Sequence, residues 1–381
     1  MIKYDALSAD FYDDRASIFA QLRDQEPVSL DDETGIFTLS RYEDVAAAAL
    51  DWETYSCVGP WTSEDPPMPG KFDPPEHTAL RNKLTKALSA ERMLAMEDDL
   101  RADARATLEV LVAQGECDLK SDYIVPCLGR VEGRLLDLTD DQVGESIACA
   151  DLLIRAIPGE PEQAPTVQER LPALFFPLIG ARKAAPGDDL ISALVTEGAD
   201  GGDGLTDPEI FGFLVNLFFP LVGLTPCAVA NSVALIGAHT EQRAELVADP
   251  SLIPQAFEEA MRLDAPQFVA NQVRVLTRDV TLHGVTLSTG AKVHLLWGAA
   301  NLDERVLENP DQFDLHRDGF EQLSFGHGVH ECLGRMLAGL EARVLLEELL
   351  SAAPDYSVTE SGPRIRSNWI LGQESLNVSF A

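Results

Sequence analysis

A cysteine in a glycine-rich loop is the residue of this chain best suited to chemistry. The stretch from Phe325 to Gly334 reads FGHGVHECLG, so glycines lie on both sides of Cys332. Glycine allows a tight backbone path and the close approach of a flat ligand. Apolar residues recur at helical spacing from Leu333 onward. The sequence therefore predicts that Cys332 lies at a helix N-terminus, where free N–H groups and the helix dipole favour a thiolate, the form that binds metals.

The remaining cysteines carry no comparable signal. They are scattered along the chain without a CxxC pair, at Cys57, Cys117, Cys127, Cys149 and Cys227. This usage is typical of reduced thiols rather than of a disulfide framework. Most of these side chains are expected in the core.

Charged residues form two further patterns. Glu259 and Arg262 are three residues apart in AFEEAMRLDAP, so on a helix their side chains meet on one face. In DPPEHTALR, His77 and Arg81 are four residues apart on the helix that follows the prolines, so both can reach one ligand. Taken alone, each of these residues is more typical of a surface charge than of a binding site.

The cysteine loop resembles the FGxGxHxCxG pattern of the cytochrome P450 superfamily, and every fixed position is met. AFEEAMR resembles the ExxR pair of that family, and Arg317 matches the arginine that completes it. DPPEHTALR resembles the DPPxHTxxR segment. The resemblance covers nearly the whole chain. It implies a mainly α fold with small β-sheets, forming a single cytochrome P450 domain of soluble bacterial type over residues 1–381.

The resemblance also implies haem b as the cofactor, with Cys332 as the axial iron ligand. An axial thiolate makes a haem iron electron-rich, which favours O–O bond cleavage. The haem propionates need cationic or hydrogen-bonding partners. The implied haem-binding positions are His77, Arg81, Arg274, Phe325, His330, Cys332 and Gly334.

One segment departs from the family pattern. The family's long central helix usually carries (A/G)Gx(D/E)T, whose acid and threonine help deliver protons, but here the stretch reads PLVGLTPC. Matching the small pair puts Thr225 at the acid and Pro226 at the threonine. Counting from the ExxR pair puts Gly223 and Leu224 at these positions. Both alignments stay open, and neither provides an acid followed by an alcohol.

This departure leaves the proton route open. Protons can come through Thr225, through water held by a distorted helix, or from a group of the substrate. Pro226 also removes one backbone donor and can expose a carbonyl on the preceding turn.

Helical signals dominate the elements that must position these residues. Capping boxes are expected at residues 40–43, 139–142 and 206–209. Two helices should carry the site, one over the haem at about 207–238 and one around 255–263 for the ExxR pair. Strands are expected at 35–39 and 291–296, with a tight hairpin at 280–287.

Composition excludes several partners. The 381-residue chain has a formal net charge of -34, whereas phosphate binding needs clustered Lys and Arg. The N-terminal segment MIKYDALSADFYDDR lacks the apolar core of a signal peptide. The apolar stretch 210–224 is broken by Asn216 and Pro220 and is too short for a membrane span. We therefore expect a cytoplasmic protein with no nucleic-acid or membrane partner.

The resemblance predicts a haem-thiolate monooxygenase acting with O2 on a small to medium apolar or aromatic organic substrate. Family analogy places the substrate near residues 58–72, the phenylalanines of 211–219, and residues 266–271. Polar side chains that could orient it are Gln267, Asn271 and Gln272. Atypical oxidation (coupling, cyclisation, dehydrogenation or peroxide use) stays open as an alternative, as does a non-catalytic haem-binding recruitment domain.

Electrons are expected from a separate ferredoxin and ferredoxin reductase, because no flavin or ferredoxin module is fused to the chain. A basic cluster could form the docking patch for an acidic ferredoxin. Its members are Arg81, Lys83, Lys86 and Arg335.

Overall fold

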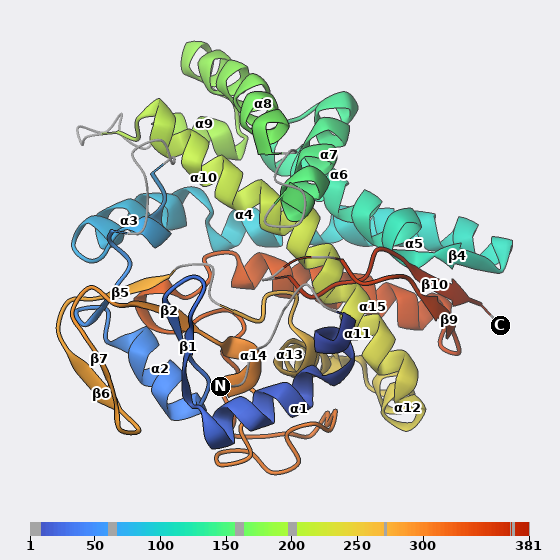
Figure 1. Cartoon of the computed structure of the whole chain (residues 1–381). Coiled ribbons are helices and arrows are strands. Elements are labelled where there is room, and N and C mark those ends of the chain that lie inside the picture. Colours follow the sequence, from blue (N-terminus) through green and yellow to red (C-terminus); the bar gives the residue numbers. More distant parts are fainter. Residues whose placement is uncertain are drawn as a thin grey trace.

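The computed structural model describes residues 9–59, 67–156, 164–196, 204–269, 273–365, 367 and 370–380. Most of this part of the chain is helical, and Figure 1 shows the short strands at the margins of the helical body. The α-helices are α1 (Ala9–Gln25), α2 (Tyr42–Leu50), α3 (Glu76–Ala87), α4 (Ala90–Leu94), α5 (Glu97–Gln114), α6 (Val125–Leu136), α7 (Asp140–Ala156), α8 (Ala164–Ala184), α9 (Leu190–Thr196), α10 (Asp207–Phe219), α11 (Thr225–Ala238), α12 (Thr240–Ala248), α13 (Ile253–Asp264), α14 (Trp297–Ala300) and α15 (Arg335–Ala352). The predicted class, mainly α with small sheets, is confirmed.

The strands are short, and within the described residues they form three sheets. They are β1 (Val28–Asp31), β2 (Ile36–Leu39), β3 (Tyr55–Ser56), β4 (Glu116–Asp118), β5 (Arg274–Leu276), β6 (Val280–Leu282), β7 (Val285–Leu287), β8 (Lys292–Leu295), β9 (Ser357–Ser361) and β10 (Leu376–Ser379). The sheet orders are β1-β2-β8-β5-β3, β4-β10-β9 and β6-β7. The strands predicted at 35–39 and 291–296 and the hairpin at 280–287 are therefore confirmed. In the largest sheet Arg274 on β5 pairs with Val293 on β8, and this pairing fixes the backbone position of Arg274.

The capping boxes have mixed outcomes. Thr206 caps α10 reciprocally with Glu209, as predicted. Thr139 and Gln142 exchange the expected pair of hydrogen bonds ahead of α7. The box predicted at residues 40–43 is wrong, because α2 has Arg41 as its N-cap and no side-chain cap of its own. The carboxylate of Asp303 accepts from the Tyr42 N–H instead, so a distant residue does the capping.

The central helix is continuous from α10 to α11 through a π-helical turn, Pro220–Leu224. It is longer than the apolar stretch 210–224 suggests, since Asp207–Ala238 spans 32 residues. By length and composition this helix could cross a membrane, but 78% of its most apolar window is buried inside the protein, as in a core helix. Figure 1 shows it running through the middle of the molecule.

The core forms around this helix. α11 packs against α13 and α15, and the buried apolar side chains of these helices belong to the largest hydrophobic cluster. α13 carries Glu259 and Arg262, while α15 follows the cysteine loop. Packing these three elements together therefore brings the separate sequence motifs to one region of the molecule.

Candidate functional site

A cavity lies beside the central helix. Its walls come from α10, the π turn and α11 on one side, and from the cysteine loop and the start of α15 on another. The helices α3, α13 and α14 and the strand β5 also contribute to the lining. Most of these are segments that the sequence motifs single out.

The cysteine loop presents its sulfur to this cavity. The Cys332 N–H donates to the Phe325 carbonyl at 2.7 Å, which closes the loop. Gly328 has φ 75°, and a Cβ there would stand 3.0 Å from the Ala49 carbonyl, so this position needs glycine. Cys332 is exposed because its side chain opens into the cavity. The loop therefore leaves one face of the thiol open to a ligand.

The electrostatics around Cys332 are mixed. Surrounding protein atoms raise the pKa of its thiol, whereas the N–H groups of Gly334 and Arg335 and the charge of Arg81 lower it. The helix α15 begins at Arg335 with Gly334 as its N-cap, slightly later than Leu333, where helical spacing starts in the sequence. These two N–H groups still reach the Cys332 sulfur. They would stabilise the thiolate that forms when the thiol loses its proton to bind a metal.

Four basic side chains gather at the edge of the cavity: His77, Arg81, Arg274 and His330. The two imidazole rings are 4.5 Å apart between centroids. Both ring nitrogens of His77, the Nε2 of His330 and the Nε of Arg274 are buried without a hydrogen-bond partner in the described part of the chain. Burial and then the three neighbouring cationic groups lower the pKa of His330 to about 3. Such a cluster is a site for an anion.

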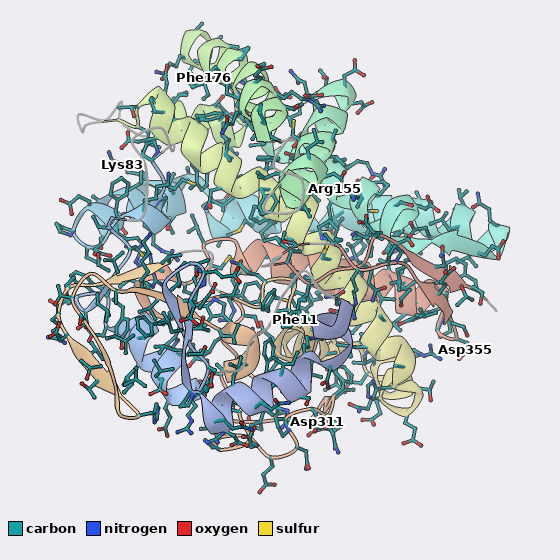
Figure 2. All side chains as sticks on the ribbon, viewed as in Figure 1. Phe11, Lys83, Arg155, Phe176, Asp311 and Asp355 are labelled. Atoms are coloured by element: carbon teal, nitrogen blue, oxygen red, sulfur yellow. The ribbon has the colours of Figure 1, made fainter. Side chains whose placement is uncertain are left out.

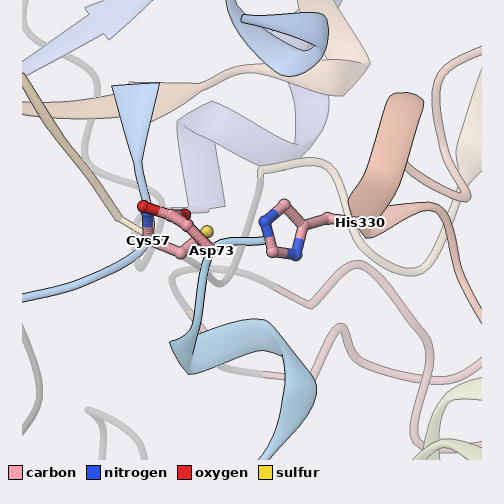
Figure 3. A group of neighbouring side chains, drawn as sticks. All are labelled: Cys57, Asp73 and His330. Atoms are coloured by element: carbon pink, nitrogen blue, oxygen red, sulfur yellow. The ribbon is translucent and has the colours of Figure 1, made fainter. Parts of the chain in front are cut away.

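A cysteine that the motifs do not mention belongs to the same cluster. The Cys57 sulfur contacts the Nη1 of Arg274, whose pKa burial lowers to about 10. Figure 3 shows Cys57, Asp73 and His330, whose ligand atoms lie within 4.8 Å of one another. Asp73 already accepts from the Ser56 hydroxyl at 2.5 Å and the Cys57 N–H at 2.9 Å. The positively charged Arg274 guanidinium lies against the Cys57 sulfur. Its charge opposes the binding of a cation by these three residues.

The ExxR prediction is confirmed. The Glu259 carboxylate accepts from the Nε and Nη2 of Arg262, both at 2.7 Å, and from the Nε of Arg317 at 2.9 Å. Arg262 also donates to the backbone carbonyls of Asn301 and Gln312. Both charges of the ExxR pair are buried, and each is neutralised and fully hydrogen-bonded. This network holds α13 to the segment before the cysteine loop.

Of the four residues of the central helix at which proton delivery was expected, two line the cavity and two do not. Leu224 and Thr225 line the cavity. Gly223 faces away, since a Cβ there would stand 3.2 Å from the Ile154 side chain, and Pro226 is buried outside the lining. No described residue hydrogen-bonds to the Thr225 hydroxyl, which is therefore free to face an occupant of the cavity.

The cavity lining includes two further polar residues that the sequence motifs did not predict. Glu341 on α15 is 1% exposed, and neither of its oxygens has a partner among the described residues. Burial raises the pKa of its carboxyl well above the usual range. Asn216 on α10 is exposed and lines the same cavity. A polar residue inside an apolar helical stretch was the only signal for Asn216, whereas Glu341 looks like any helical glutamate.

Part of the predicted substrate region cannot be placed. Gln267 lines the cavity, as expected. Asn271 and Gln272 lie outside the described residues, as does much of the segment 58–72.

Comparison with known proteins decides the family. The model of the family "Cytochrome P450" matches residues 231–354. The chain is 30% identical to a steroid C26-monooxygenase of Mycobacterium tuberculosis, covering 99% of this chain and 96% of that protein. The chain belongs to the cytochrome P450 family. A vitamin D(3) 25-hydroxylase of Pseudonocardia autotrophica is also 30% identical, over 93% of this chain and 90% of its own.

Solved P450 structures show the same fold. The cytochrome P450 CYP109Q5 from Chondromyces apiculatus superposes with a TM-score of 0.89 at 26% identity, covering 100% of this chain and 98% of that one. The protein is thus an enzyme of the P450 monooxygenase type, and its family implies a haem cofactor. The residues present fit this group: an open thiol faces the cavity, and His77, Arg274 and His330 have buried nitrogens without a partner among the described residues, which suit the carboxylates that haem carries.

Proposed function

We propose that the protein is a cytoplasmic haem-thiolate monooxygenase that oxidises a small to medium apolar or aromatic molecule. Its cofactor is haem b, with Cys332 as the axial ligand. The observation that carries this proposal is the pairing of an open cysteine thiol with buried basic side chains whose nitrogens have no hydrogen-bond partner among the described residues. Relatives named for steroid and vitamin D(3) oxidation support an apolar substrate, as does the apolar lining contributed by α10 and α11.

Each residue of the site has a distinct task. His77, Arg81, Arg274 and His330 bind the haem propionates, and Phe325 and Gly334 shape the loop around the sulfur. Haem, when bound, supplies the oxygen chemistry at an electron-rich iron. The N–H groups of Gly334 and Arg335 hold negative charge on the Cys332 sulfur. The Glu259–Arg262–Arg317 network keeps the loop in place.

Replacing the ligand tests this assignment. The reduced, CO-bound wild type should show the thiolate Soret band, and Cys332→Ser should lose it. Cys117→Ser, which changes a cysteine on β4 outside the cavity lining, should keep the band. A wild type that binds haem without a thiolate spectrum would contradict the proposal and favour a non-catalytic haem-binding domain.

Thr225 is the proposed proton-relaying residue of the central helix, because its hydroxyl lines the cavity where the family's acid–alcohol pair is missing. A neutral hydroxyl relays a proton only when water or a substrate group continues the chain.

The missing acid favours a second candidate function, oxidation without oxygen insertion. Product analysis under labelled dioxygen separates the two, since only a monooxygenase places the label in the product.

A ferredoxin with its reductase is the proposed electron source. Of the predicted basic patch, Arg81 lines the cavity, and Arg335 is paired with Glu331 at 2.8 Å and Glu258 at 3.2 Å. Lys83 and Lys86 lie outside the buried face of α3, and Figure 2 labels Lys83. These two lysines are therefore the proposed contacts for an acidic ferredoxin.

Charge reversal tests this contact. The double change Lys83→Glu and Lys86→Glu should slow reduction by ferredoxin without changing substrate affinity. The matched control is Arg278→Glu with Lys292→Glu, which alters the same charge beside the β6–β7 hairpin. Equal reduction rates for the two double variants would argue against the patch.

A further inference from the structure

The α10 end of the cavity carries one polar side chain in an apolar wall. Asn216 lines the cavity together with Leu217, Phe219 and Leu221. Its side chain is exposed there, and no described residue hydrogen-bonds to its amide. An amide group offers one acceptor oxygen and two N–H donors. Asn216 is therefore equipped to bind a polar group that enters the cavity.

The backbone of the helix is irregular at the same place. Pro220 has no N–H, so it cannot donate to the carbonyl of Asn216, the acceptor four residues before it. This carbonyl lacks its usual intrahelical partner. Pro220 also lines the cavity, so the disturbed turn lies at its wall.

Asn216 lies on the same side of the central helix as Leu224, at a distance that follows from their spacing in the sequence. Asn216, Pro220, Leu224 and Ala228 all line the cavity at a spacing of four residues, as one stripe of a helix does. Asn216 lies eight residues before Leu224, which at the α-helical rise is about 12 Å. One molecule of moderate length can therefore touch both Asn216 and the segment of Leu224 and Thr225.

We propose that Asn216 is a specificity-determining residue that binds the hydroxyl group of an otherwise apolar substrate and so sets its orientation along the central helix. A hydroxyl both donates and accepts, which matches the donors and the acceptor of the Asn216 amide. A hydrocarbon would displace water from the amide without replacing its hydrogen bonds, which costs affinity. This inference rests on the proposed function, because it assumes that the cavity holds the substrate.

A matched ligand pair tests the inference. Binding of cyclododecanol and cyclododecane to the haem-loaded enzyme is measured by the spin-state shift of the Soret band. The preference is the ratio of their dissociation constants, and Asn216→Leu should reduce the preference for the alcohol by about threefold to tenfold. Leucine has a similar volume and is a good helix former, so the variant should fold. Asn216→Ser, which keeps a donor and an acceptor, should give an intermediate preference.

Leu217→Val is the control, because it alters the same wall without removing a polar group and should change both affinities alike. An unchanged preference in Asn216→Leu, or a wild type that does not bind cyclododecanol, overturns the inference. The CO spectrum of each variant is recorded on the same samples. A thiolate band with an unchanged preference rejects only the role of Asn216, whereas a missing band in the wild type rejects the proposed function itself.

Discussion

Two buried clusters of charge in this protein have opposite designs. In the first, Glu259, Arg262 and Arg317 neutralise one another, and the Glu259 carboxylate accepts a further hydrogen bond from the Asp314 N–H at 3.1 Å. In the second, an arginine (Arg274) and the imidazoles of His77 and His330 pack together, and several buried nitrogens have no hydrogen-bond partner among the described residues. The first cluster satisfies its own hydrogen bonds, whereas the second has buried nitrogens that remain available to a ligand.

The difference separates structure from binding. A buried ion pair that is fully hydrogen-bonded can be broken only at high cost, because one charge is left without a partner. A buried cation without a partner destabilises the empty protein and pays for itself only when the ligand arrives. The second cluster is therefore expected to destabilise the ligand-free protein, as polar groups prepared for a ligand do.

Removing the acid of the first cluster should have the largest effect. Glu259→Gln leaves two arginines facing a neutral amide, so the free energy of unfolding should fall by about 3–5 kcal/mol. Urea denaturation followed by circular dichroism measures this loss. Glu331→Gln makes the same chemical change in the exposed pair with Arg335 and should cost less than about 1 kcal/mol. Similar losses in the two variants would show that the buried network has no special weight.

A buried acid without a cation extends the comparison to the opposite charge. Glu132 is fully buried, accepts from the Ser146 hydroxyl at 2.6 Å, and has its pKa raised by burial to about 8 from a usual 4.5. Between these pKa values folding takes up a proton, so stability falls as pH rises. From about pH 5.5 to about pH 7.5 the wild type should lose about 2.5 kcal/mol relative to Glu132→Gln.

Denaturant unfolding at a series of pH values measures this slope. Glu145 is the control acid, because hydrogen bonds from Arg170 lower its pKa, so that it stays ionised in the folded and unfolded states across this window. Glu145→Gln should therefore follow the wild-type slope. Parallel curves for the wild type and Glu132→Gln would mean that Glu132 is ionised in the folded protein.

Removing one cation of the second cluster should have the smallest effect. It should stabilise the apoprotein slightly but weaken the binding of haem. Arg274→Met should leave the apoprotein as stable as the wild type or more so, because a desolvated charge is removed. The same change should weaken haem binding by about 2 kcal/mol, the worth of a charged hydrogen bond. Unfolding of the apoprotein and haem transfer to apomyoglobin measure the two effects. A destabilised apoprotein with normal haem retention would make Arg274 a structural residue.

The motifs that are continuous in the chain could be predicted from the sequence. The cysteine loop, the ExxR pair and the capping box at Thr206 depend on spacings of a few residues, which local helix and turn geometry converts directly into contacts. The fold class follows from the same signals. The capping box at residues 40–43 failed because Asp303, far away in the sequence, supplies the cap of α2.

The tertiary structure alone decided which residues share the cavity. His77 and His330 meet because α3 packs beside the cysteine loop, and Arg335 pairs with Glu258 on α13. The π turn at Pro220–Leu224 changes the residues per turn, so a regular helical period cannot tell which of its neighbours face inward. The sequence by itself thus determined the family and predicted Cys332 as the ligand, whereas packing decided that Leu224, Thr225 and Asn216 line the cavity.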